Sequence, residues 1–408
     1  MTVPAPPSLE RRVRSLSTAP LSMGARRPLI SAARGLAGFE FHVAESMIGR
    51  LRRRDDVVAA NACTAGVLGA MRLACAEQLV ALAELPAAWL ARVQAEKEIA
   101  PGMMLVLRPG WALDDAEDLP AVARLLREHG AQVGWRPDGA PWPSGLQPDF
   151  LLLTGLKHVA DLAPWKGHAP LLLATNLPDV DTLEALLAGG LGLASCDVGM
   201  PVCQSPQALP PQAQGLLQLL NDLVQDEDHA RVVASIKADA ALSVRLLQYL
   251  NSAGASPGRV LDSIDQAVMV LGRDALYRWV AQMLLRLGPP RQSTGGLQSL
   301  ALARARLVEL LARARGEANP GSLYLLGLAS MLPVLLQCPL SEALKTLRLP
   351  REAVLALTGR VGPWAPYLSL AIALEQPRSD EAATLATPWG GLEAVLPLSA
   401  QAWQGPAR

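Results

Sequence analysis

The sequence has few of the residues that the common catalytic and metal-binding sites require. It contains five histidines and five cysteines among 408 residues. The cysteines are odd in number and form no Cys-x-x-Cys pair, which favours reduced thiols over a disulfide framework or a zinc site. They are Cys63, Cys75, Cys196, Cys203 and Cys338. No Gly-x-x-x-x-Gly-Lys phosphate loop and no Gly-x-Ser-x-Gly nucleophile motif occurs.

The chain also lacks net charge, because 37 Lys and Arg residues balance 37 Asp and Glu residues. A dedicated nucleic-acid binder needs a basic surface, so we expect no nucleic-acid partner. Neutrality favours association, which makes a homo-oligomer a candidate state. The first 25 residues contain no apolar core of a signal peptide, and the most apolar run, Leu323–Cys338, is short for a bilayer span and contains Pro333. The sequence predicts a cytoplasmic protein without a membrane span.

Apolar and polar patterns divide the chain into an α/β part and an all-α part. Residues 1–25 read as a disordered tail. Strand-like runs then alternate with helical patterns over residues 26–201, which is typical of a parallel fold, and seven or so such units favour a (β/α) barrel. The predicted strands are 36–41, 79–83, 103–107, 132–135, 150–154, 171–174 and 191–195, and the predicted helices are 55–76, 86–97, 118–129 and 179–188. A proline-rich linker follows at 202–211.

Residues 212–385 show only helical patterns. Asp239 is placed to cap a helix in which Leu242, Leu246 and Leu250 fall on one side. Such short amphipathic helices must pack on one another, so we expect an all-α domain. Its predicted helices are 216–224, 228–238, 239–250, 263–271, 274–287, 297–313, 322–337, 341–347, 351–357 and 364–375. Residues 386–408 read as a C-terminal tail.

The second half resembles a known family. Three motifs follow one another in this half. They are Leu209-Pro210-Pro211, the run Ile236…Asp239…Leu242-Ser243…Leu246-Leu247…Asn251-Ser252, and Ile264…Gln266-Ala267…Leu271-Gly272. Together these residues resemble the HDOD domain over 205–385. The resemblance implies an all-helical, HD-related domain of bacterial signalling proteins that lacks the HD metal ligands. His229 is the only histidine in this half and is followed by Ala230, and one imidazole cannot build an HD metal site.

The first half resembles the EAL domain. The resemblance rests on Arg27-Pro28-Leu29-Ile30 and Gly38-Phe39-Glu40. EAL domains are barrel phosphodiesterases that cut cyclic di-GMP with two divalent metals, so the resemblance implies oxygen ligands at strand ends. It places the signature Glu at Glu40, an Asn at Glu84 and a second Glu at Val106.

The same resemblance places the remaining metal-site residues at later strands. The paired aspartates fall on Arg136-Pro137, with Asp138 just beyond, and the Lys and Asp fall on Leu152 and Thr154. Of these ligands only Glu40 is retained, although Asp138 would supply one if the register shifted by one residue. Arg136 would place a positive charge where cations should bind.

We therefore expect no catalytic, cofactor-binding or metal-binding residues, no cofactor and no enzymatic activity. The expected function is bacterial signal transduction by protein–protein interaction, with HDOD helices such as Ser322–Gln337 as the docking face and signalling proteins as partners. The alternative is a divergent cyclic di-GMP phosphodiesterase or a cyclic di-GMP-binding sensor.

Overall fold

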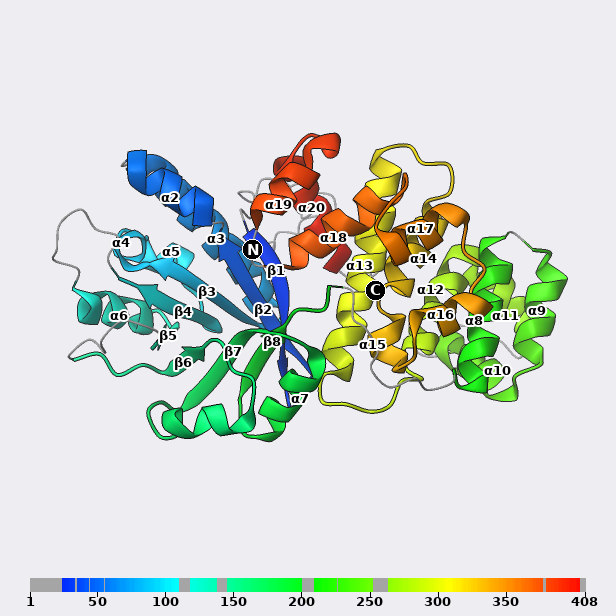
Figure 1. Cartoon of the computed structure of the whole chain (residues 1–408), viewed down its shortest axis with the longest axis horizontal. Helices are drawn as coiled ribbons and strands as arrows, with labels where there is room; N and C mark the ends of the chain where they lie inside the picture. The colour runs from blue at the N-terminus through cyan, green and yellow to red at the C-terminus, as the bar shows by residue number, and fades with distance from the viewer. Residues whose placement is uncertain are drawn as a thin grey trace, which may run out of the picture. The chain divides into compact units, whose positions relative to one another are not determined.

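The computed structural model describes residues 24–403, apart from residues 34, 44, 55, 110–117, 138–144, 200–208, 226, 252–262 and 377–378. The chain divides into two compact units, one of Met1–Asp197 with Ala373–Pro397 and one of Val198–Ile372 with Leu398–Arg408 (Figure 1). This division falls four residues before the predicted end of the barrel. It also assigns to the first unit a late segment that we expected in the helical domain and the tail. The predicted tail at 1–25 and the predicted linker lie largely outside the described residues.

The first unit contains a closed barrel, as the sequence predicted. Among the described residues eight strands follow one another around it in chain order. They are β1 (Gly24–Ser31), β2 (Gly35–Val43), β3 (Val80–Pro86), β4 (Met103–Arg108), β5 (Gln132–Trp135), β6 (Phe150–Leu153), β7 (Leu171–Leu177) and β8 (Leu193–Cys196). β1 runs antiparallel to both of its neighbours, β2 and β8, whereas all other neighbours are parallel. β1 is the strand that the sequence patterns did not reveal.

Helices follow most of the strands of this unit. They are α2 (Glu45–Arg54), α3 (Val57–Ala76), α4 (Ala87–Leu90), α5 (Ala95–Glu98), α6 (Leu119–Glu128), the 3-10 helix η1 (Val159–Trp165) and α7 (Val180–Ala188), with α19 (Ser379–Leu385) and η2 (Thr387–Trp389) late in the chain. Asp56, Asp118 and Asp179 each accept a backbone N–H at the start of a helix, at 2.7–2.9 Å, which satisfies a donor that the helix itself leaves free. The predicted helix 86–97 is instead two short helices, and α2 was not predicted.

The barrel interior is packed with apolar side chains. Leu82, Met104, Val106, Phe150 and Leu152 are buried in one cluster with residues from β1, β2, β7 and β8. Because side chains alternate along a strand, residues two positions further along face the same interior. Such packing is a filled core, so any chemistry must take place at an end of the barrel.

The second unit is helical, as predicted. Its helices are α8 (Pro211–Val224), α9 (His229–Lys237), α10 (Ala240–Asn251), α11 (Ile264–Leu271), α12 (Arg273–Leu285), α13 (Thr294–Ala314), α14 (Pro320–Ala329), α15 (Leu332–Leu336), α16 (Leu340–Thr346) and α17 (Arg351–Gly359). Two further helices, α18 (Ala365–Glu375) and α20 (Leu392–Trp403), cross the division between the units. Asp239 accepts the backbone N–H of Leu242 at 3.0 Å, which confirms the predicted cap.

A buried arginine fixes the first residues of this unit. Arg304 on α13 is 1% exposed. Its guanidinium donates to the carbonyls of Val198 and Gly199 at 2.7 and 3.2 Å, and to Ser330 Oγ at 2.9 Å. These bonds satisfy polar groups that would otherwise be costly to bury, and they tie the chain just after β8 to α13.

Candidate functional site

Several inward-facing polar residues lie at the carboxyl end of the barrel. Glu40 on β2 pairs with Leu82 on β3, and Glu84 pairs with Val106 on β4. Leu82 and Val106 belong to the interior cluster, so both glutamates face inward. Arg136 follows β5 in the same alternation as Gly134, the partner of Val106. The residues that the EAL resemblance singled out therefore do share one end of the barrel, and this end is the candidate site.

Glu40 is buried among partners that stabilise its charge. Its side chain accepts a hydrogen bond from Ser195 Oγ on β8 at 2.8 Å, and its other oxygen lies 3.2 Å from His42 Nε2. Arg27 on β1 is its partner across the β1–β2 ladder. The arginine itself is held by Asn176 Oδ1 at 2.8 Å and by the Glu375 carbonyl at 3.1 Å.

The pKa of Glu40 records this environment. Burial alone would raise it, but the nearby charges of His42 and Arg27 and the hydrogen bond from Ser195 outweigh burial and lower it from 4.5 to about 2. The carboxylate is thus ionised at neutral pH without a metal ion. Asn176 contributes from a left-handed backbone conformation, with φ of 59°, which asparagine tolerates better than most residues.

The second glutamate of the site is paired with the arginine that the sequence flagged. Arg136 Nη2 donates to Glu84 Oε2 in an ion pair that is partly exposed to solvent. Val106 and Leu152 are fully buried apolar side chains of the interior cluster. Thr154 lies just beyond the end of β6 and is half-buried. Asp138 lies outside the described residues.

This set of residues does not fit a pair of divalent metals. Hard cations need several converging oxygens, yet the described residues contain no group of three His, Cys, Asp or Glu side chains that could hold an ion. Glu40 is occupied by Ser195 and His42, Glu84 by Arg136, and Val106 offers no ligand atom. No catalytic step through a metal follows from this arrangement.

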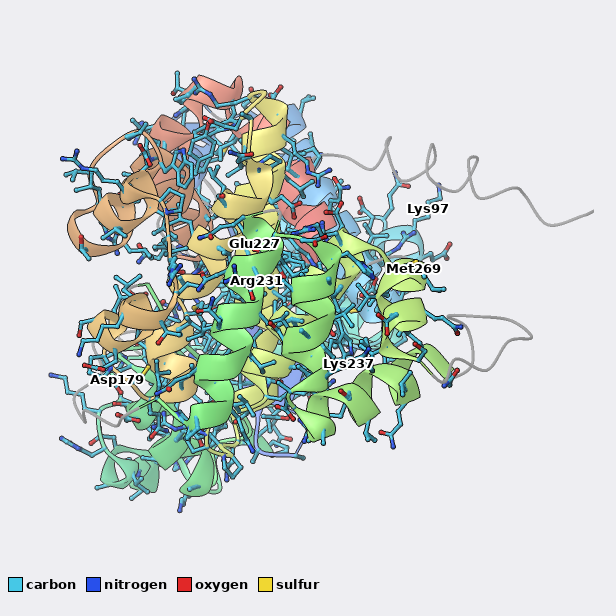
Figure 2. The ribbon with its side chains drawn as sticks, turned by 90° about the vertical axis from the view of Figure 1, so that its right-hand side faces the viewer. Lys97, Asp179, Glu227, Arg231, Lys237 and Met269 are labelled. Carbon is cyan, nitrogen blue, oxygen red and sulfur yellow. The ribbon has the colours of Figure 1, made fainter. Side chains whose placement is uncertain are left out.

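The segment of the helical domain that we expected to form the docking face is not exposed to solvent. Every residue from Ser322 to Leu336 is buried, so the prediction that Ser322–Gln337 forms the docking face is wrong: these residues are the core of the domain. Exposed apolar side chains instead lie on two neighbouring helices, Val244 and Tyr249 on α10 and Met269 and Val270 on α11, with 53%, 46%, 67% and 54% of their surface exposed. Met269 is labelled in Figure 2.

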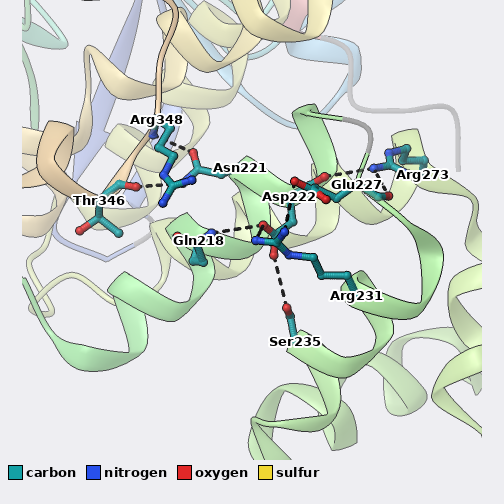
Figure 3. Close-up of polar contacts among 9 residues, drawn as sticks. All are labelled: Gln218, Asn221, Asp222, Glu227, Arg231, Ser235, Arg273, Thr346 and Arg348. Carbon is teal, nitrogen blue, oxygen red and sulfur yellow. Dashed lines mark hydrogen bonds and ion pairs between the residues drawn. The ribbon is translucent and has the colours of Figure 1, made fainter.

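A polar network also lies in the helical unit, and sequence reasoning missed it (Figure 3). Asp222 on α8 is 3% exposed. It accepts from Gln218 at 3.2 Å and Ser235 at 3.3 Å, and Arg231 lies 3.4 Å away. Arg273 donates to backbone carbonyls at the end of α8. Each polar group of this network has a partner, so it explains how α8 is held and points to no ligand. His229, at the start of α9, is exposed.

The sequence comparisons identify the family of the domain in the second half of the chain. Residues 208–348 match the family model described as the HDOD domain. The molecule is thus a closed (β/α) barrel followed by an HDOD domain.

Two curated relatives match part of the chain. One is the uncharacterised protein YuxH of Bacillus subtilis (strain 168), 32% identical over 173 residues, which are 41% of this chain and 42% of the relative. The other is named cyclic di-GMP phosphodiesterase CdgJ, of Vibrio cholerae serotype O1, 30% identical over 156 residues, which are 38% of this chain and 36% of the relative. The chain therefore matches less than half the length of either relative.

Solved structures of EAL domains are also similar to the chain. The EAL domain of Xanthomonas citri FimX in complex with c-diGMP covers 47% of this chain and 93% of its own, with a TM-score of 0.36 and 11% identity. A standalone EAL protein of Vibrio cholerae O395 in its c-di-GMP-bound form covers 43% and 89%, with a TM-score of 0.34 and 14% identity.

Proposed function

We propose that this protein acts in cyclic di-GMP signalling as a non-catalytic regulator, and that its HDOD domain binds other signalling proteins. The observation that carries the proposal is the Glu84–Arg136 ion pair at the carboxyl end of the barrel. An arginine that neutralises a glutamate in the site replaces the cation that a metal phosphodiesterase would place there. The relative named cyclic di-GMP phosphodiesterase supports the pathway.

A hydrolysis assay tests the absence of catalysis. The full chain is incubated with cyclic di-GMP and either Mg²⁺ or Mn²⁺, beside an active phosphodiesterase as the positive control. We expect no turnover above the blank, and no difference between the wild type and Glu40→Ala. Metal-dependent turnover that falls in Glu40→Ala would establish the divergent phosphodiesterase instead.

A second candidate function is a sensor that binds cyclic di-GMP without cutting it. Arg108 ends β4 and is the ladder partner of Pro86, two residues beyond Glu84. It therefore lies at the same end of the barrel as Arg136, and arginines at this end suit phosphate oxygens. Calorimetry with cyclic di-GMP separates the candidates. A sensor gives a heat of binding without added metal, and Arg108→Ala reduces that heat. A pure adaptor gives no heat of binding.

The exposed side chains on α10 and α11 are the surface through which we propose that the HDOD domain binds its partner. Burying Val244 and Met269 at an interface would remove apolar surface from water. Affinity capture with the full chain should recover a partner that the double variant Val244→Asp, Met269→Asp loses. Val361 is the control, since its exposure of 54% is close to the 53% of Val244 and it lies outside this surface. If Val361→Asp removes the same partner, the surface is wrongly assigned.

A further inference from the structure

A single buried arginine joins two parts of the first unit that are far apart in the sequence. Arg27 on β1 is 3% exposed. Its Nε donates to the backbone carbonyl of Glu375 at 3.1 Å, and its Nη1 donates to Asn176 Oδ1 at 2.8 Å. Glu375 is the last residue of α18, so Arg27 connects the barrel to the end of a helix 348 positions later.

The bond to Glu375 supplies a donor where the helix has none of its own. The last carbonyls of an α-helix have no partner within the helix. A positive charge beside them is also favourable, because the negative end of the helix dipole lies there. Arg27 therefore stabilises the last turn of α18 by a hydrogen bond from a charged donor.

The same guanidinium belongs to the charge distribution of the candidate site. Arg27 is paired with Glu40 across the β1–β2 ladder. Burial alone would raise the pKa of Glu40, but the charges of His42 and Arg27 lower it to about 2. A buried guanidinium in turn needs negative charge nearby, because an uncompensated buried charge is costly. The position of Arg27 thus depends on the charge of Glu40, and the last turn of α18 depends on the position of Arg27.

The second anchor of the guanidinium is open to solvent. Asn176 on β7 is exposed and has a left-handed backbone, with φ of 59°. It lies where the pairing of β7 with β8 shifts register, between Ala174 and Leu177. The group that orients the buried Arg27 is therefore accessible to a solute at this end of the barrel.

We propose that Arg27 couples the charge at the carboxyl end of the barrel to the last turn of α18. Loss of negative charge at Glu40, or an anion that attracts the guanidinium, withdraws Arg27 from the Glu375 carbonyl and loosens that turn. The first residues of α18, up to Ile372, are assigned to the second unit, so the helix gives the barrel end a covalent route to the helical domain. The coupling requires neither catalysis nor a bound nucleotide.

Hydrogen–deuterium exchange of the full chain, followed by mass spectrometry, measures the coupling. A helix end opens at a lower free energy than the core, so the amides of the last turn of α18 report the contact with Arg27. Glu40→Gln should speed their exchange about tenfold, the factor expected for the loss of a hydrogen bond from a charged donor. The slowest amides of β4 report unfolding of the whole unit, so they separate this local effect from a general loss of stability.

Two variants leave both Glu40 and α18 unchanged. Asn176→Gly removes the acceptor that orients the guanidinium and keeps the left-handed backbone accessible. Arg27→Lys keeps the positive charge but removes the planar fork that donates in two directions. Both should speed exchange in the last turn of α18. In Arg27→Lys the acid-dependent loss of stability at Glu40 should persist, because the charge opposite Glu40 is retained.

Arg127 provides a matched control in the same unit. Its Nε donates to Asp149 Oδ2 at 2.9 Å, and its Nη2 donates to the backbone carbonyl of Gln147. Arg127→Lys therefore changes an arginine with similar partners at another place in the barrel. It should leave the exchange of α18 as it is in the wild type.

A double variant tests whether Arg27 is the route between Glu40 and α18. Arg27→Met alone removes the donor to the Glu375 carbonyl. If Glu40 acts through Arg27, adding Glu40→Gln to Arg27→Met should give no further increase in exchange of the last turn, whereas independent effects would multiply. Should Arg27→Met fail to fold, Arg27→Lys takes its place in the comparison.

Three results would overturn the coupling. One is unchanged exchange of the last turn of α18 in Glu40→Gln. Another is a multiplied effect in the double variant, and the third is an equal acceleration by Arg127→Lys. None of these measurements depends on hydrolysis or on nucleotide binding, so they are independent of the tests of the proposed function.

Discussion

Glu40 offers a sharp test of the charge distribution at the barrel end. Its pKa is lowered from 4.5 to about 2 in the folded protein, and the residue is 4% exposed. Such a difference corresponds to about 3 kcal/mol of preference for the charged form in the folded state. Because the folded pKa is the lower one, this contribution is fully present above the unfolded pKa and is lost as the pH falls from 4.5 toward about 2.

The variant Glu40→Gln keeps the shape of the side chain and removes its charge. At pH 7 we expect the first unit to lose about 3 kcal/mol of unfolding free energy. Below pH 4.5, where the wild type begins to lose the same contribution, the gap between the two proteins should narrow. Urea denaturation at several pH values, followed by tryptophan fluorescence and circular dichroism, measures both effects. The two units unfold in separate steps if they are independent, so each transition is fitted by itself.

Glu84→Gln is the matched control. Glu84 also faces an arginine, but its side chain is 22% exposed and that of Arg136 is 33% exposed, and a solvated ion pair contributes about 0–1 kcal/mol. If Glu40→Gln is as stable as the wild type at pH 7, or if its deficit is the same at pH 7 and pH 3, the carboxylate is not held by the charges we assign to it.

Three further changes test the packing of the helical unit. Arg304→Met should destabilise it by about 1–3 kcal/mol, since it removes the donor to the buried carbonyl of Val198, and calorimetric unfolding measures the loss. Gly327→Ala should cost about 1–3 kcal/mol, because the new methyl group would lie 2.7 Å from the Ala305 backbone; a lowered urea midpoint checks it. Asp239→Ala should remove about 1 kcal/mol with the cap on Leu242, whereas Asp239→Asn should retain most of the stability.

The sequence carried enough information for the main elements because their patterns are local. Strand β5 was predicted with its observed bounds, and β4 within one residue, since short apolar runs between turns have few alternatives in a parallel fold. The cap at Asp239 was predictable for the same reason: it joins Asp239 to a residue only three positions later in the chain. Local rules thus recovered both the barrel and the helical domain.

The elements that were missed depend on partners far along the chain. β1 contains Arg26, Arg27 and Pro28, which do not form a strand-like apolar run, and it is a strand because β2 and β8 pair with it. The predicted helix 297–313 contains Arg304, and an arginine is rarely fully buried. It is buried because carbonyls more than 100 positions earlier accept its hydrogen bonds. No periodicity in the sequence records such a partner.

The candidate site shows the same difference between features that residue types predict and features that depend on contacts in the folded protein. The EAL resemblance predicted which metal ligands would be missing and that Arg136 would bring a positive charge. It did not indicate that Arg136 would bind Glu84, or that Arg27 and His42 would surround Glu40. Two carboxylates at one end of a barrel repel each other unless positive charge is supplied. Here the chain supplies that charge from its own side chains, so Glu40 and Glu84 are stable without a bound cation. A variant that restored single metal ligands would therefore still have to compete with the arginines already in place.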